Sequence, residues 1–236
     1  MLEVANRVAE FPWRSIADRL AQEGFSRIGT LLTESECKEL RSLYSESERF
    51  RAHINMARYR FGKGEYQYFA YPLPELVAHL REELYAYLYQ TANAWLSALG
   101  EETTCPAKFA AFLDQCRARG QVRPTPLLLR YRAGDFNCLH QDIYGDVVYP
   151  FQVIVALSDP LIDFRGGELL LIEQRPRAQS RGYALTLGRG EAVVISTRFR
   201  PIKGTRGYYR ATLRHGVSTV LAGERFTLGL VFHDSK

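Results

Sequence analysis

Three polar residues in the second half of the chain have the types and spacing needed for metal chemistry. His140 and Asp142 are separated by one residue, and His215 follows much later in the sequence. Two imidazoles and one carboxylate can occupy one face of an octahedral metal and leave the opposite positions open, as in non-haem Fe(II) oxygenases. The sequence therefore predicts an iron site with room for exogenous ligands.

An arginine ten residues beyond His215 extends this pattern. Side chains alternate between the two faces of a strand. A strand over 225–232 has a packing face of Phe226, Leu228, Leu230 and Phe232, and a second face of Arg225, Thr227, Gly229 and Val231. A guanidinium binds a carboxylate through two parallel hydrogen bonds. We therefore expect Arg225 to hold a dicarboxylate co-substrate, 2-oxoglutarate; a surface ion pair with Glu224 is the alternative.

The residues before position 120 have helical patterns. A helix is predicted from Trp13 to Gln22, before Gly24, and residues 33–36 have the form of a capping box that opens a second helix. A longer helix is predicted between Pro74 and Gly100, with leucines four residues apart. We expect these helices to brace a core and to contribute a substrate lid.

After Pro126 the pattern changes to short apolar runs broken by Gly, Pro and Asp. Seven strands are predicted, with an eighth around His140. They cover residues 127–131, 151–157, 168–172, 184–187, 191–195, 215–220 and 225–232. Short strands at this spacing favour a double-sheet fold such as a jelly roll. We predict an α+β protein with one domain over 1–236, in which 1–120 give helical support and a lid, and 121–236 form the β core.

Composition and charge leave several classes of protein open. Of the 236 residues, 46% are hydrophobic and 24% charged, which suits one well-buried core rather than extensive disorder. The net charge of +5 favours polyanions but does not select for them. Free thiols are expected at Cys37, Cys105, Cys116 and Cys138, which lack framework spacing. Without a membrane-spanning apolar run or a signal-peptide pattern, we expect a cytoplasmic protein.

The chain resembles the double-stranded β-helix core of Fe(II)/2-oxoglutarate dioxygenases over about residues 127–233. The resemblance is carried by RYRAGDFNCLHQD, FRGGELLL and RHGVSTVLAGERFTLGLVF. The first of these segments is most similar to AlkB-type nucleic-acid demethylases, whereas Gly166-Gly167-Glu168 is closer to prolyl hydroxylases. With MARYRFGKGEYQYFAYPLP and EQRPRAQSRG included, the whole chain resembles a bacterial oxygenase family proposed to demethylate damaged DNA.

This resemblance implies a role for each matching residue. His140, Asp142 and His215 would bind Fe(II), and Arg225 would bind the distal carboxylate of 2-oxoglutarate. Tyr131 matches a tyrosine that hydrogen-bonds the co-substrate. The implied reaction consumes O2, releases succinate and CO2, and hydroxylates a substrate C–H bond.

Two departures from the AlkB-type pattern affect the co-substrate pocket. Leu129 and Thr227 stand where those enzymes have asparagines, so this part of the pocket must be built differently. Thr227 is still expected to line it. Gln152, the one polar residue in an apolar strand, is a candidate for a replacement contact.

Basic and aromatic residues form two segments that suit a nucleic-acid substrate. The candidate contacts are Arg198, Arg200, Arg210 and Tyr208, just upstream of His215, and Tyr68 in an earlier segment. Such residues can hold phosphates and stack a flipped or unpaired base. An ordinary solvated loop with aromatic anchors is the alternative.

Three hypotheses follow. The first is a 2-oxoglutarate oxygenase that demethylates alkylated nucleic acid, as in DNA repair. The second is the same chemistry on a protein side chain or small metabolite, and the third is a non-catalytic or zinc-binding β-module. Succinate formation that requires Fe(II) and 2-oxoglutarate separates the third from the others. Formaldehyde release from methylated oligonucleotides, compared with amino acids and peptides, separates the first from the second.

Overall fold

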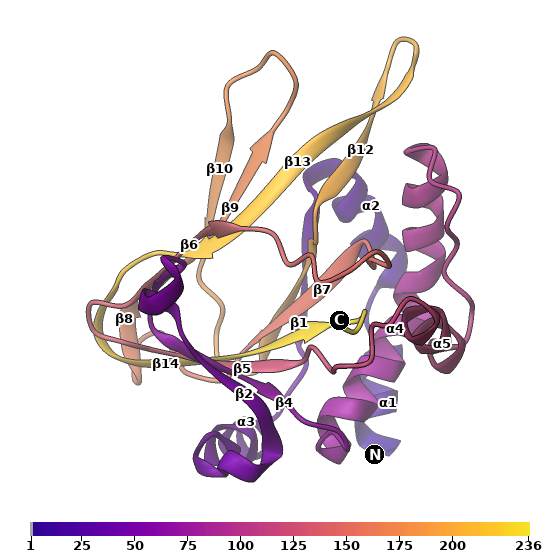
Figure 1. Ribbon diagram of the computed structural model, residues 1–236. Coiled ribbons are helices and arrows are strands. Elements are labelled where there is room, and N and C mark those ends of the chain that lie inside the picture. The colour runs from indigo at the N-terminus through magenta and orange to yellow at the C-terminus, as the bar shows by residue number, and fades with distance from the viewer. Residues whose placement is uncertain (1) are drawn as a thin grey trace.

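Two antiparallel β-sheets form the core of the computed structural model, which describes residues 2–236 (Figure 1). The larger sheet has eight strands in the order β1-β11-β7-β14-β5-β4-β2, with β8 paired to β14. The smaller sheet has six strands in the order β10-β9-β13-β6-β3, with β12 paired to β13. Sequence-distant strands are therefore neighbours in both sheets.

The strands of each sheet come from most of the chain. The larger sheet contains β1 (Phe25–Thr30), β2 (Phe50–Asn55), β4 (Glu65–Phe69), β5 (Leu127–Arg132), β7 (Phe151–Ala156), β8 (Phe164–Gly166), β11 (Glu191–Ser196) and β14 (Val220–Val231). The smaller contains β3 (Gly62–Lys63), β6 (Phe136–His140), β9 (Leu169–Gln174), β10 (Arg181–Leu185), β12 (Phe199–Gly204) and β13 (Gly207–Val217).

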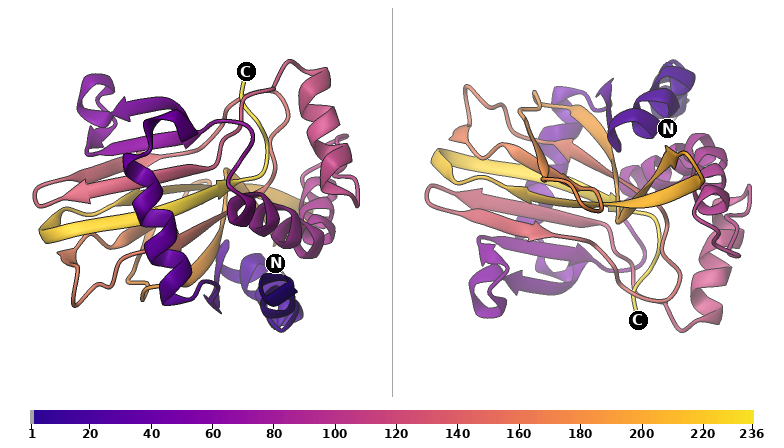
Figure 2. Two further views of the ribbon diagram at one scale, coloured as in Figure 1. Left: turned by 90° about the horizontal axis from the view of Figure 1, so that it is seen from below. Right: turned by 90° about the horizontal axis from the view of Figure 1, so that it is seen from above.

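Helices cover the larger sheet. They are α1 (Leu2–Ala9), α2 (Trp13–Glu23), α3 (Glu34–Ser42), α4 (Glu75–Ala98) and α5 (Phe109–Ala118), with short 3-10 helices η1 (Leu43–Ser45), η2 (Ser47–Arg49) and η3 (Met56–Tyr59). The left view of Figure 2 shows α3 lying across the larger sheet. Leu80, Leu84 and Leu88 of α4 share one buried cluster with Phe226 and Leu228 of β14, so the predicted apolar faces pack together.

Several predicted elements agree with the structure. The helix after residue 13 ends at Gly24, whose φ of 81° is the left-handed conformation that glycine adopts easily. Thr33 and Glu36 form the expected capping box. The long helix spans Glu75–Ala98, and all four cysteines are free. Among the described residues, no helix is both long and apolar enough to cross a membrane.

Other predictions were wrong in their limits. The part of the chain before residue 120 is not only helical, because β1, β2 and β4 belong to the larger sheet. The strand predicted over 215–220 is instead the end of β13 and the start of β14, with the chain reversing at Ser218 and Thr219. The basic segment before His215 is a hairpin of β12 and β13. Of these strands, β1 and β4 pair with the sequence-distant β11 and β5, and local patterns do not reveal such pairing.

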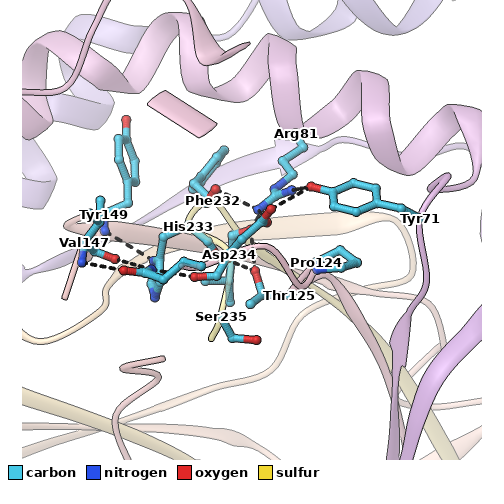
Figure 3. Close-up of polar contacts among 12 residues, drawn as sticks. Tyr71, Arg81, Pro124, Thr125, Val147, Tyr149, Phe232, His233, Asp234 and Ser235 are labelled. Atoms are coloured by element: carbon cyan, nitrogen blue, oxygen red, sulfur yellow. Dashed lines mark hydrogen bonds and ion pairs between the residues drawn. The ribbon is translucent and has the colours of Figure 1, made fainter. Parts of the chain in front are cut away.

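A buried arginine of α4 forms hydrogen bonds to the backbone at the end of β14 (Figure 3). Arg81 is 1% exposed. Its guanidinium donates to the carbonyls of Val231 (2.9 Å) and Phe232 (2.7 Å) and to the Asp234 carboxylate (2.7 Å). The Tyr71 hydroxyl donates to the other carboxylate oxygen of Asp234 at 2.9 Å. The guanidinium and the Asp234 carboxylate are both buried, so each depends on these partners for its hydrogen bonds.

We expect Arg81→Met to lower the free energy of unfolding by about 3–5 kcal/mol, because it leaves the Asp234 carboxylate buried without a cation. Urea unfolding followed by circular dichroism measures the change. Arg81→Met combined with Asp234→Asn should recover part of the loss, since no uncompensated charge remains. A single variant as stable as the unmodified protein would contradict this account.

Candidate metal centre

β6 and β13 bring the two predicted ligand histidines together. His140 is the last residue of β6 and lies directly opposite His215 of β13, so both side chains leave the same face of the smaller sheet. Their ring centroids are 4.3 Å apart. Asp142 follows in the loop after β6, and the ligand atoms of the three residues all lie within 4.8 Å of one another. No other group of this kind occurs among residues 2–236.

Hydrogen bonds and charge interactions orient the three side chains toward one another. The Cys138 carbonyl lies 2.8 Å from His140 Nδ1, which leaves Nε2 of that ring facing Asp142 at 3.5 Å. Nε2 of His215 lies 3.2 Å from the other carboxylate oxygen. Although burial opposes ionisation of Asp142, the two histidines hold its pKa well below the usual value. Burial and the neighbouring His140 lower the pKa of His215, so its imidazole stays neutral.

The centre opens into a cavity of about 190 Å³ between the two sheets. Among its lining residues are His140, Asp142, His215, Arg225, Tyr131, Thr227, Gln152 and Tyr68. Every residue that the sequence placed at the metal or at the co-substrate thus lines one cavity. Phe226, Leu228, Leu230 and Phe232 lie in the core cluster, so the predicted phase of β14 is confirmed.

Arg225 is a buried cation that has no carboxylate within ion-pair distance among residues 2–236, although Glu168 influences it from farther away. It is 5% exposed, and its Nη1 has no hydrogen-bond partner among the described residues. Its nearest aromatic neighbours are the rings of Tyr131 and Phe164, whose centroids lie 5.5 and 5.9 Å from the guanidinium carbon. Burial lowers the pKa of Arg225, which reflects the cost of keeping an unpaired charge out of water. The cavity is therefore built to receive an anionic group.

Comparison with known protein families assigns the chain. A family model described as "Oxygenase, catalysing oxidative methylation of damaged DNA" matches residues 64–235. The chain belongs to this oxygenase family. Two uncharacterized proteins of Mycobacterium tuberculosis, from strains CDC 1551 / Oshkosh and ATCC 25618 / H37Rv, are each 47% identical to it over 167 residues, covering 71% of this chain and 72% of theirs.

Solved structures share the fold of this oxygenase. A prolyl-4-hydroxylase of Pseudomonas putida superposes with a TM-score of 0.54 at 16% identity, covering 95% of this chain and 99% of that one. A prolyl hydroxylase of Trichoplax adhaerens, solved with a hypoxia inducible factor peptide, gives 0.54 at 14% identity, covering 99% and 93%. The shared fold confirms the predicted jelly-roll core, and the family match identifies the protein as an oxygenase.

The oxygenase cavity also contains polar residues that the sequence did not single out. The Asn137 amide donates to the Tyr131 hydroxyl at 3.2 Å, and both residues line the cavity. An amide from β6 therefore lines the same cavity as Leu129, the residue at one of the two departures from the AlkB-type pattern. Gln152 is 2% exposed, and its Nε2 has no partner among the described residues. The alternation of β6 is the only local signal for Asn137.

Tyr144 was also missed, although it contacts the central carboxylate directly. Its hydroxyl donates to Oδ1 of Asp142, the oxygen that lies nearer to His140. Burial first, and then the charge of Asp142, raise the pKa of Tyr144 well above its usual value, so the hydroxyl remains a donor. The ring packs edge-on against Tyr68. The spacing of two residues from Asp142 was the available signal.

We expect Tyr144→Phe to weaken metal binding by about 10- to 100-fold, the usual effect of removing a hydrogen bond to a metal ligand. The phenyl ring keeps the packing against Tyr68, so the unfolding temperature should change little. Titration with Mn(II) or Co(II) in the absence of substrate measures the affinity. An unchanged affinity would show that the hydroxyl does not position Asp142.

The expected substrate contacts upstream of His215 are largely not at the cavity. Arg200 is 3% exposed, and its guanidinium is used by the Glu173 carboxylate and the Ala21 carbonyl. Tyr208 and Arg210 lie seven and five residues from His215 along β13, so alternation directs them to the opposite face. Arg198 is the exception in this set. It is exposed, it does not face away from His215, and it has no acidic partner among the described residues. Tyr68, from the other segment, lines the cavity.

Proposed function

We propose that this oxygenase depends on Fe(II) and 2-oxoglutarate and oxidatively removes alkyl groups from nucleic acid. His140, Asp142 and His215 bind the iron, and Arg225 binds the far carboxylate of 2-oxoglutarate. The observation that carries the proposal is the pairing, in one cavity, of three ligand-type side chains with a buried arginine that has no anion. Neither feature is useful to stability alone, because both place charge away from water.

The donor set suits ferrous iron. Two imidazoles and a carboxylate occupy three positions and leave the cavity side open, which fits an iron centre that accepts a co-substrate better than a closed structural zinc site. The Cys138 carbonyl fixes the orientation of His140, and the Tyr144 hydroxyl fixes that of Asp142. Such partners hold ligands in place before the metal arrives.

The opposite part of the cavity suits a dicarboxylate. Arg225 supplies a charge-assisted donor, and Thr227, two residues along the same strand, faces the same space. Tyr131 of β5 lies directly opposite Arg225 and lines the same cavity, so these groups can gather around one carboxylate. Gln152 of β7 pairs with Val231, six residues from Arg225 along β14, so its unpaired amide lines a different part of the cavity.

Gly167, the second residue of a glycine pair, leaves room for the Arg225 side chain. Gly166 and Gly167 have φ values of 72° and 65°, which are the left-handed conformation. A Cβ on Gly167 would approach the Arg225 side chain to 3.0 Å and Val220 to 2.9 Å. Packing against Arg225 is therefore one structural reason for glycine at position 167 of the Gly-Gly-Glu segment.

Iron with bound 2-oxoglutarate and O2 would supply the oxidant for a substrate C–H bond, yielding succinate and CO2. The protein contributes enclosure and orientation. Apolar and aromatic walls such as Leu169, Val217 and Tyr66 limit water at the centre. On an N-methyl group the insertion of oxygen leads to loss of formaldehyde, which is why we propose removal rather than addition of methyl groups.

An aromatic pair at the edge of the cavity supports a nucleobase as substrate. Tyr59 and Phe61 are stacked, with ring centroids 5.5 Å apart and an angle of 19° between the planes. They are nevertheless 55% and 48% exposed, and Phe61 lines the cavity. The Phe61 carbonyl accepts a hydrogen bond from Cys138 of β6 at 2.7 Å, which holds the pair beside His140. Exposed stacked rings are suited to bind a base.

We expect Tyr59→Ala to raise the KM for a methylated single-stranded oligonucleotide by about 5- to 150-fold, the range of base–aromatic stacking of about 1–3 kcal/mol. The matched control is Tyr208→Ala, since Tyr208 is 54% exposed but faces away from the metal centre. Steady-state formaldehyde release gives both values. Equal effects of the two substitutions would contradict a specific role for Tyr59.

Substrate-stimulated succinate formation tests the proposed function. The protein with Fe(II) and 2-oxoglutarate is offered methylated oligonucleotides, methylated nucleosides and proline-containing peptides. Stimulation with equimolar formaldehyde from the oligonucleotides is the expected result. Stimulation by peptides alone would favour a protein hydroxylase, the second candidate, which shares its fold with the prolyl hydroxylases. No Fe(II)-dependent succinate with any substrate would overturn the proposal.

A further inference from the structure

The positive charge of the chain is concentrated in one segment. Residues 174–214 contain ten Lys or Arg and one acidic residue, Glu191, for a net charge of +9. The whole chain has a net charge of only +5, so the remainder is net negative. Because the positive charges are gathered in one segment, they produce a local electrostatic potential much stronger than the small net charge of the whole chain suggests.

Most of this segment belongs to two hairpins, which we call the arms, and β11 of the larger sheet lies between them in the chain. The first arm is the β9–β10 hairpin with its turn at 175–180, and the second is the β12–β13 hairpin with its turn at 205–206. Both belong to the smaller sheet, and their turns point in the same direction, away from the larger sheet (Figure 1). Both arise beside the metal centre, because His215 of β13 lies opposite Leu171 of β9 on one side and His140 of β6 on the other.

Most of the cations on the arms are not neutralised. Arg175 and Arg200 pair with Glu173, and Arg210 pairs with Glu101. Six others in the segment are exposed and have no acidic partner among the residues that the structure describes. These are Arg177, Arg181, Arg198, Lys203, Arg206 and Arg214. Like charges gathered on narrow hairpins repel one another, and a polyanion removes this repulsion.

We infer that the two arms bind the sugar-phosphate backbone of the nucleic-acid strand whose base enters the cavity. That this strand is the substrate rests on the proposed function, whereas the binding of a strand by the arms does not depend on that function. From His215 to the turn of the second arm is eight residues, or about 26 Å of strand. At about 3.4 Å per nucleotide this corresponds to roughly eight nucleotides. Cations occur on both faces of the arms, which suits contact with a backbone that passes between or around them.

Salt dependence of binding tests this inference without any chemistry. The holoprotein is titrated into a fluorescent, unmethylated 15-nucleotide single strand at several KCl concentrations, and anisotropy gives Kd. The test variant is Arg181→Gln with Arg206→Gln, one substitution in each arm. The matched control is Lys108→Gln with Arg119→Gln, two exposed cations at the ends of α5 without acidic partners within 2–236. Both variants lose the same charge.

We expect the arm variant to reduce the slope of log Kd against log[KCl] by about 0.7 for each phosphate that the protein no longer neutralises, and the control to leave the slope unchanged. A four-nucleotide strand should show little difference between the two variants, because it cannot reach the arm turns. Equal slopes for the arm variant and the unmodified protein, or an equal reduction in the control, would overturn the inference. Turnover of a methylated nucleoside should persist in the arm variant. If the unmodified protein and both variants lack this activity while the salt slopes differ as expected, the proposed function is wrong and the inferred binding surface is still supported.

Discussion

Replacing His215 by alanine is expected to abolish metal retention and turnover together. The substitution leaves two of the three ligand side chains and removes the imidazole that lies 3.2 Å from the Asp142 carboxylate. Loss of a hydrogen bond to a ligand already costs about 10- to 100-fold in metal affinity, so loss of the ligand itself should exceed this. Titration with Co(II) or Mn(II) measures the affinity, and succinate formation measures turnover.

A histidine elsewhere provides the control for this experiment. His53 of β2 is outside the metal cavity, with a side chain that is 54% exposed, and His53→Ala should retain both properties. Normal iron-dependent turnover in His215→Ala would refute the ligand assignment. Loss of turnover with unchanged metal affinity would also contradict it, because the histidine would then act on something other than the metal.

Replacing Arg225 should separate co-substrate binding from stability. We expect Arg225→Ala to raise the KM for 2-oxoglutarate by about 10- to 150-fold, since a charge-assisted hydrogen bond contributes about 1.5–3 kcal/mol. Metal affinity without 2-oxoglutarate should not change. Arg225→Met should leave the unfolding temperature equal or higher, because the guanidinium is buried without an anion. If Arg225 stabilised the fold, Arg225→Met would instead lower the unfolding temperature.

The control for Arg225 is another arginine beside β14. Arg165 lies on β8, which pairs with β14, and its side chain is exposed. Arg165→Ala should leave the KM for 2-oxoglutarate unchanged. If Arg225→Ala also leaves the KM for 2-oxoglutarate unchanged, a different group binds the carboxylate, and the proposed role of Arg225 in co-substrate binding must be revised.

Local patterns were sufficient for much of the candidate site. The phase of β14 follows from alternation within the strand itself, so the sequence could assign Arg225 to the cavity face and Phe226 to the core. His140 and Asp142 are neighbours in the chain, and a one-residue spacer at a strand end keeps them close. Helix caps at Thr33 and Gly24 are equally local. In each case the relevant interaction spans only a few residues.

The tertiary structure decided everything that depends on which strands are neighbours. Arg200 appeared to be an exposed cation until the register of β12 against β13 and the packing of α2 buried it with Glu173. Tyr208 and Arg210 are near His215 in sequence, yet they leave the other face of β13. Tyr59 and Phe61, about 80 residues before His140, lie beside it because β3 pairs with β6.

The sequence by itself determined the ligand-type residues, the arginine and the jelly-roll class, because residue chemistry and side-chain alternation are properties of short segments. Only the tertiary structure showed that the arginine lacks an anion, that Tyr144 holds Asp142, and that the cations gather on two projecting arms. These features depend on burial and on pairing between distant strands. Alternation within a strand determines which face of the strand a side chain occupies, whereas the register between distant strands determines which residues that side chain contacts.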